Sequence, residues 1–173
     1  MAVYRFDNFT PEIQEGCYIA ESAQVIGNVK IGKGCYIGPN AILRGDYGQI
    51  VIGEQTAVEE GVIIHARPGE ITTIGNRVTL GHGAIIHNCT IEDSAVIGMG
   101  AVVSDYAIVR EWGVVAEGAV VKNKSVVESG SVVAGIPARE VGRVSEEYKA
   151  KWNHFKDIYF ELASTYPARL IRL

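Results

Sequence analysis

The chain has 173 residues, a formal net charge of −4 at pH 7 and 47% hydrophobic residues, a size that fits one domain with at most a small appendage. The charge is spread out without a Lys/Arg cluster, which argues against a nucleic-acid partner. No apolar run approaches the roughly 18 residues needed to cross a membrane, the first residues lack a signal pattern, and the three cysteines show no CxxC spacing. We therefore expect a cytoplasmic protein that binds neither membrane nor nucleic acid.

A branched aliphatic residue recurs every six positions along most of the chain, with three breaks. An inward side chain at a fixed period of six is typical of a solenoid of short parallel strands, with one strand per six-residue unit and three units per coil. The residue four places later in each unit tends to be small, as at Ala41 and Ala84, because large and small side chains must alternate to fill a narrow interior. The repeating aliphatic residues are Ile19, Val25, Ile31, Ile37, Leu43, Ile52, Val58, Ile64, Ile74, Leu80, Ile86, Ile91, Ile97, Val103, Val109, Val115, Val121, Val127 and Val133.

Three segments follow from this pattern: a cap at 1–18, the solenoid at 19–140, and a C-terminal helix with a tail at 141–173. Ser145 can cap a helix whose first turn contains Glu146 and Glu147, which is favourable at the positive end of the helix dipole. An apolar stripe at alternating spacings of four and three predicts that this helix packs along the solenoid or across a subunit boundary. The stripe consists of Tyr148, Trp152, Phe155, Tyr159, Leu162 and Tyr166.

The three breaks in the repeat lie close together in the sequence. Leu43 to Ile52 contains three extra residues, Ile64 to Ile74 contains four, and Ile86 to Ile91 is one residue short. Insertions in a solenoid emerge as loops at one corner, where binding sites tend to be built.

Three of the four histidines, His65, His82 and His87, fall in this same segment. With three units per coil, His65 and His87 share a face with Arg44, each directly after a large aliphatic residue. Adjacent coils lie about 4.8 Å apart, so two imidazoles can converge on one ion at Zn–N bonds of about 2.0–2.1 Å. His82 belongs to the preceding face and points across a corner, so it would reach this ion from a neighbouring chain in a closed ring of three.

Three histidines with one open position are a catalytic arrangement for Zn2+. The same imidazoles accept Fe2+ or Co2+, so the residues leave the metal open. Water at the open position would have its pKa lowered from about 15.7 towards about 7 and could act as hydroxide at neutral pH.

Four sequence runs resemble the gamma-class carbonic anhydrase family: Arg44–Asp46, Val58–His65, Gly81–Cys89 and Ile97–Ala101. The likeness is greatest to the bacterial branch often labelled carbonic anhydrase-like or ferripyochelin-binding-like. It implies an all-β solenoid, namely a left-handed parallel β-helix of hexapeptide repeats with a C-terminal α-helix, assembled as a homotrimer with interfacial metal sites. The handedness comes from the resemblance alone, because parallel crossovers are generally right-handed.

The resemblance implies an activity, the reversible hydration of carbon dioxide to bicarbonate by a metal-bound hydroxide at the trimer interfaces. It implies that Arg44 and Asp46 form an ion pair across the subunit interface that orders the site. It also places Glu59 beside the metal-bound water and, by a weaker alignment, Tyr159 and Glu161 in the lining of the site.

The chain differs from the active enzymes of that family in three places. Glu59 stands where they carry Gln, Tyr47 stands where they carry an acidic residue, and the loop Ala66–Thr73 holds only Glu70 in place of an acidic proton shuttle. Two further functions therefore compete with carbon dioxide hydration. One is an acyl-CoA thioester hydrolase or acyltransferase-like protein, which the repeats and the ending Ala134–Ala138 also fit. The other is a non-catalytic metal-binding subunit.

Overall fold

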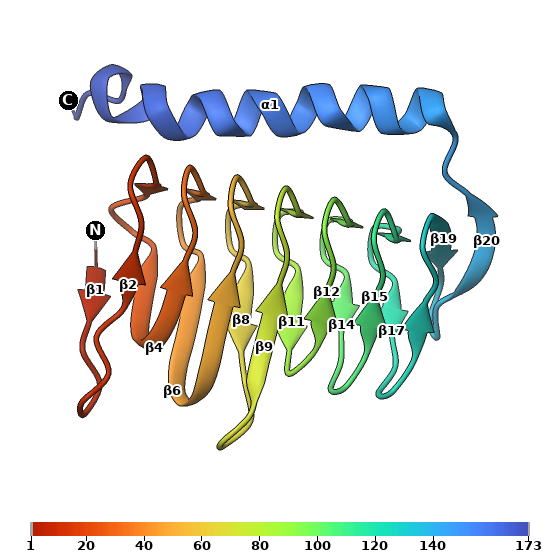
Figure 1. The fold of residues 1–173 in the computed structure, drawn as a ribbon, viewed down its shortest axis with the longest axis horizontal. Helices are drawn as coiled ribbons and strands as arrows, with labels where there is room; N and C mark the ends of the chain where they lie inside the picture. The colour runs from red at the N-terminus through yellow and green to blue at the C-terminus, as the bar shows by residue number, and fades with distance from the viewer. Residues whose placement is uncertain (1, 173) are drawn as a thin grey trace.

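The six-residue repeat folds as a parallel β-solenoid with three faces, and a long helix lies alongside it (Figure 1). The computed structural model describes residues 2–172. Each coil pairs in register with the next one, so that Val25 lies beside Leu43 and Leu43 beside Ile64. The predicted solenoid of three units per coil with a C-terminal helix is therefore confirmed.

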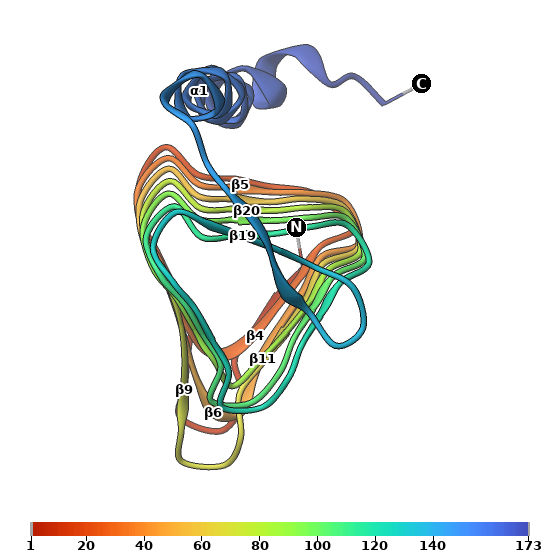
Figure 2. The same cartoon turned by 90° about the vertical axis from the view of Figure 1, so that its right-hand side faces the viewer.

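One face of the solenoid lies beneath the helix, and we call it the helix face (Figure 2). Its eight strands run parallel except for the last, which turns back antiparallel along the edge. In sheet order the strands are β3 (Tyr18–Ile19), β5 (Tyr36–Ile37), β7 (Ala57–Val58), β10 (Thr79–Leu80), β13 (Val96–Ile97), β16 (Val114–Val115), β19 (Ser131–Ala134) and β20 (Arg139–Arg143).

The other two faces belong to one sheet, because two long strands, β4 (Gln24–Ile31) and β6 (Ile42–Ile52), run around the corner between them. The histidine face continues from their first halves with β8 (Ile63–His65), β11 (Ile85–His87), β14 (Val102–Val103) and β17 (Val120–Val121). The third face continues from their second halves with β9 (Ile71–Ile74), β12 (Thr90–Ile91), β15 (Ile108–Val109) and β18 (Val126–Val127). At the N-terminal end, β1 (Ala2–Tyr4) and β2 (Glu12–Ile13) pair with β4.

The repeating aliphatic side chains fill the interior of the solenoid. All of them are buried except Ile19, which is half-buried in the first coil. The small residues between them, such as Ala41 and Ala84, are fully buried as well. Branched side chains suit short strands, and the alternation of large and small residues keeps the narrow interior closely packed.

Helix α1 (Glu146–Arg169) runs along the helix face and begins as predicted. The Ser145 Oγ accepts a hydrogen bond from the backbone N–H of Tyr148 at 3.1 Å, and Glu146 and Glu147 lie in the first turn. The predicted apolar stripe is wrong at Phe155, which is 39% exposed. Lys156 points into the interface in its place and is only 2% exposed.

The segment boundaries predicted from the sequence are less sharp in the structure. β1 and β2 lie within the predicted cap yet add strands to the solenoid, and β20 crosses the boundary at residue 140. Within residues 2–172, no helix combines the length and the apolar character that a membrane span requires.

Candidate functional site

The breaks in the repeat all lie at one corner, where the histidine face meets the third face, and we call it the loop corner (Figure 2). The first inserted segment is a bend within β6 at residues 45–48, and the second is the loop at residues 66–70 between β8 and β9. The two segments are bonded to each other, because Gly69 N donates to Tyr47 O at 3.0 Å and Gln49 N donates to Glu70 O at 2.8 Å.

The predicted histidine column lies at this corner. Arg44 pairs in register with His65, and His65 pairs in register with His87. His65 Nδ1 lies 3.2 Å from His87 Nε2. The far nitrogen of each ring faces a carboxylate: His65 Nε2 lies 3.0 Å from Asp46 Oδ1, and His87 Nδ1 contacts Asp105 Oδ1.

This arrangement has the donor chemistry of two metal ligands. When each imidazole donates its far N–H to its carboxylate, both nitrogens that face each other carry a lone pair, and two lone pairs in contact repel unless a cation lies between them. Histidines that bind metals almost always donate their other N–H to a carboxylate, a carbonyl or water. His65 and His87 therefore fit a divalent transition metal.

Both carboxylates at the loop corner are held in their charged form. Burial acts to raise the pKa of Asp46, but hydrogen bonds from Arg44 and His65 outweigh it and hold the pKa below its usual value. Hydrogen bonds from Arg67 and, more weakly, from His87 hold the pKa of Asp105 below its usual value. An ionised carboxylate has only acceptor atoms, so Asp46 and Asp105 can each accept the far N–H of one imidazole.

His82 lies at the opposite edge of the histidine face, between β10 and β11, where that face meets the helix face. Its Nε2 lies 3.1 Å from Glu59 Oε2 and its Nδ1 lies 2.6 Å from Glu60 Oε2. Tyr159 from α1 lines the same cavity as Glu59 and His82. We call this group the helix corner.

Burial sets the electrostatics of the helix corner. It raises the pKa of Glu59, although Tyr159 and the charge of His82 oppose the shift. Burial also raises the pKa of Tyr159, and the nearby Glu59 adds to the effect. Thus α1 shields these polar groups from water, whereas the His82 ring stays half-exposed.

A cavity of about 520 Å³ opens between α1 and the solenoid beside the helix corner. Glu59, His82 and Tyr159 line one part of it. The rest is mainly apolar, with walls that include Val96, Met99, Val114, Trp152 and Phe155.

The residues predicted for the site thus form two groups. Arg44, Asp46, His65 and His87 meet at the loop corner, and His82, Glu59 and Tyr159 meet at the helix corner. Within residues 2–172 of one chain, no three His, Cys, Asp or Glu side chains converge in a way that could hold a metal ion. A complete three-histidine site would therefore need two chains.

Arg44 Nη1 pairs with Asp46 Oδ2 inside one chain, at 2.6 Å. The ion pair that the resemblance implies across the subunit interface involves a second chain and stays a prediction. One residue differs from the expectation drawn from the resemblance. Glu161 is exposed and is not among the residues that line the cavity; its backbone carbonyl accepts hydrogen bonds from the hydroxyls of Ser164 and Thr165. The sequence pattern did not indicate Asp105, which lies one position past the register of His87, because Ile86 pairs with Val103 only 17 residues later.

Comparison with known proteins identifies the family. Residues 10–45 match the model of the bacterial transferase hexapeptide (six repeats). The carnitine operon protein CaiE of Escherichia fergusonii is 36% identical over 154 residues, which cover 89% of this chain and 78% of that protein. CaiE of Escherichia coli strain K12 / DH10B is 37% identical over 147 residues, covering 85% and 75%. The chain belongs to this hexapeptide-repeat family. The resemblance to its gamma-carbonic-anhydrase-like branch and the left-handed β-helix are thereby confirmed.

Solved structures agree over nearly the whole chain. A hexapeptide transferase family protein from Anaplasma phagocytophilum superposes with a TM-score of 0.91 at 32% identity, covering 95% of this chain and 98% of that one. A Bacillus cereus protein provisionally described as an acetyltransferase superposes with a TM-score of 0.93 at 26% identity, covering 95% and 96%.

Proposed function

We propose that the chain is a metal-dependent enzyme whose sites form between copies of itself in a homotrimer. His65 and His87 of one copy and His82 of the next would hold the metal. The 3.2 Å approach of His65 Nδ1 to His87 Nε2, with a carboxylate behind each ring, carries this proposal. Zn–N bonds of about 2.0–2.1 Å accommodate nitrogens at this separation. We propose Zn2+, with Fe2+ or Co2+ as metals that the same ligands accept.

Such a metal would supply a Lewis acid and a water that ionises near neutral pH. The chain's own residues would supply the rest of the site. Asp46 and Asp105 orient the two rings, and Arg44 keeps Asp46 charged. Glu59 accompanies His82 and could take up a proton from the reacting water. Tyr159 would hold the Glu59 carboxylate in place from the helix.

An acyl thioester is the substrate class that the observations favour. The cavity beside His82 is mainly apolar and about 520 Å³ in volume, which suits an acyl group and far exceeds what carbon dioxide needs. The two similar solved structures are described as transferase proteins, which points the same way. In hydrolysis, water would add to the thioester carbonyl, the C–S bond would break, and the thiolate would leave with the proton that the water gave up.

Hydration of carbon dioxide is the second candidate. It is supported by the sequence runs around Arg44, His65 and His87, which resemble those of the gamma-class carbonic anhydrases. The acidic proton shuttle of that family has no free counterpart in the loop, because Asn88 and Tyr106 both donate to Glu70 at 2.5 and 3.0 Å. A slow hydration rate is expected if this is the reaction.

The test is turnover by metal-analysed protein loaded with Zn2+ or, anaerobically, with Fe2+. A series of acyl-CoA thioesters and carbon dioxide would be assayed on the wild type, on His87→Ala and on His154→Ala, the last as a control on the exposed face of α1. We expect His154→Ala to match the wild type and His87→Ala to lose the metal and at least about 1,000-fold in rate. Turnover of carbon dioxide alone would favour the second candidate. Full metal without turnover would indicate a non-catalytic subunit, and wild type without metal would refute the proposal.

A mixing experiment tests whether two chains complete each site. His82→Ala and His87→Ala chains would be unfolded, mixed in equal amounts and refolded together. Because a shared site takes His82 from one chain and His87 from another, random assembly should restore about one quarter of the sites. Each variant refolded alone should stay inactive. No recovery in a mixture that refolds to trimers would refute the shared site.

A further inference from the structure

We propose that Asp105 is a positioning residue for His87. We propose further that Arg67, in the loop at residues 66–70, sets the orientation of the Asp105 carboxylate. The inference rests on the proposed metal site, because it explains how the pair of histidines is prepared for a cation. Asp105 comes from the turn after β14, one coil beyond His87, and its side chain is only 8% exposed. It touches no proposed ligand other than His87 in the contacts of the described residues.

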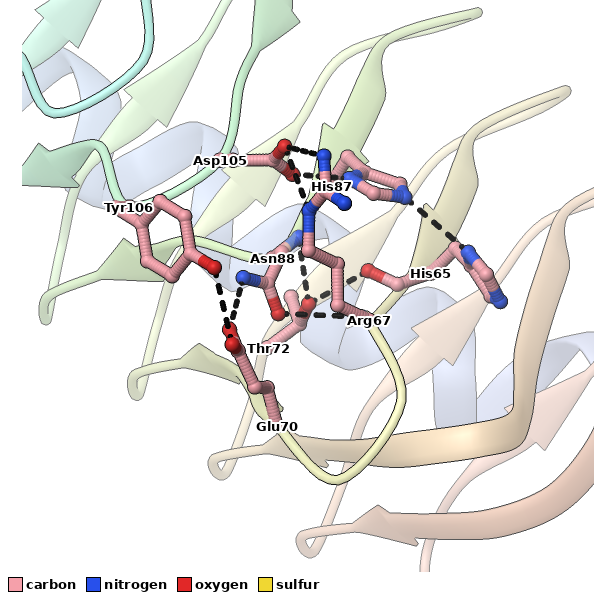
Figure 3. Close-up of polar contacts among 8 residues, drawn as sticks. All are labelled: His65, Arg67, Glu70, Thr72, His87, Asn88, Asp105 and Tyr106. Carbon is pink, nitrogen blue, oxygen red and sulfur yellow. Dashed lines mark hydrogen bonds and ion pairs between the residues drawn. The ribbon is translucent and has the colours of Figure 1, made fainter.

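Both oxygens of the Asp105 carboxylate are engaged (Figure 3). Oδ1 contacts His87 Nδ1, and Oδ2 accepts from Arg67 Nε at 2.9 Å and from Arg67 Nη2 at 2.5 Å. A guanidinium only donates hydrogen bonds, so the atom of residue 105 that faces Arg67 must be an acceptor. The carboxylate then presents its second acceptor to His87, which keeps the proton of that ring on Nδ1 and leaves the Nε2 lone pair facing His65.

Thr72 of β9, the strand that follows this loop, connects the backbones that carry the two rings. Thr72 Oγ1, which is fully buried, donates to His65 O at 2.6 Å and accepts from Asn88 N at 3.0 Å. Asn88 Oδ1 accepts from Arg67 N at 3.2 Å. Arg67 therefore reaches His87 twice, through the Asp105 carboxylate and through the neighbouring residue Asn88. Arg67 of the loop thus holds the surroundings of His87, and Thr72 of β9 connects the backbone of His65 to that of Asn88.

This geometry gives an unusual prediction for Asp105→Asn. An amide has one acceptor and one donor group, and Arg67 faces it with donors only. The amide oxygen should therefore turn to Arg67 and the NH₂ group to His87, which forces the His87 proton onto Nε2. Removing the guanidinium as well, in Asp105→Asn with Arg67→Ala, frees the amide to turn back. The double variant should then recover the wild-type tautomer.

The experiment reads the His87 tautomer by ¹⁵N NMR of metal-free, histidine-labelled full-length protein. We expect the proton on Nδ1 in the wild type, in Arg67→Ala and in the double variant, and on Nε2 in Asp105→Asn. Asp93→Asn is the matched control, because Asp93 also accepts from a neighbouring coil, through Asn76 at 2.8 Å, without touching a histidine.

Zinc affinity, measured by chelator competition, is the second readout. Loss of such an outer partner typically weakens metal binding by about 10–100-fold, which we expect for Asp105→Asn and not for Asp93→Asn or the double variant. An unchanged tautomer and affinity in Asp105→Asn would overturn the inference. If the wild type binds none of Zn2+, Fe2+ and Co2+, the proposed function fails, but the tautomers of the metal-free proteins still decide whether Asp105 positions the ring.

Discussion

The two edges of the histidine face carry the two halves of the candidate site, yet they are built in different ways. The loop corner arises from extra residues in the backbone, and its polar groups bond to residues one coil away. The helix corner interrupts no repeat, and its polar groups are shielded because α1 covers them. A solenoid can therefore form a polar site at one corner by inserting residues into the backbone, and at another corner by covering polar side chains with a helix. The packing of its interior stays the same in both cases.

The largest expected effect is a loss of stability from truncating core residues, and it shows whether the interior is packed equally well beneath both corners. Leu80 precedes the helix corner and Ile86 precedes the loop corner in the same coil, and both are fully buried. We expect Leu80→Ala and Ile86→Ala each to lower the free energy of unfolding by about 2–5 kcal/mol, through lost burial and the remaining cavity. Urea unfolding at one fixed protein concentration measures both, since assembly contributes to the stability of a trimer.

The control for this pair is Val126→Ala, an outward position on the third face that is 45% exposed. It should change the unfolding free energy by no more than about 0.5 kcal/mol. A large difference between the two core variants would show that the insertions at the loop corner also alter the packing beneath it.

The next largest effect is expected from a substitution that disrupts the loop corner and leaves the helix corner unchanged. A Cβ on Gly48 would lie 2.6 Å from Glu70 O and still closer to Arg67 O, so Gly48→Ala must push the two inserted segments apart. We expect a loss of about 1–3 kcal/mol, together with faster amide exchange at residues 66–70. Gly142→Ala, where an added Cβ meets nothing within 4 Å, is the control. Faster exchange around His82 as well would show that the two corners are coupled.

The parts of the molecule that could be predicted from the sequence are those that repeat. The period of six determines which residues share a coil position, so the alignment of His65 with His87 and the separation of His82 followed from counting. The helix start followed from Ser145 and the two glutamates after it.

The contacts that could not be predicted are those between side chains of different coils and between the helix and the solenoid. The bonds of Asp105 to His87 and Arg67 require the conformation of an irregular loop, about which the repeat carries no information. Lys156 was missed for another reason. Hydrophobic periodicity assumes that only apolar side chains face the solenoid, whereas a long amine can be buried where acceptors and aromatic rings meet it.

The smallest effect concerns that buried amine on the helix face. Lys156 Nζ donates to Thr79 Oγ1 at 3.1 Å and to Ala95 O at 3.3 Å, between the rings of Trp112 and Trp152. Burial lowers the pKa of Lys156 to about 7; the charge of Arg77 adds to this shift and that of Glu59 opposes it.

The sign of the resulting pH dependence follows from the direction of this shift. Between the folded pKa of about 7 and the unfolded value of about 10.4, the unfolded chain binds a proton that the folded chain lacks, so stability should rise with pH. From pH 7 to 8 the gain from Lys156 should be about 1 kcal/mol. Lys156→Met should remove this gain, whereas Lys122→Met, on an exposed turn, should keep it. Parallel pH profiles for the wild type and Lys156→Met would contradict the prediction, because the amine would then be equally protonated in both states and α1 would hold a charged group against the solenoid.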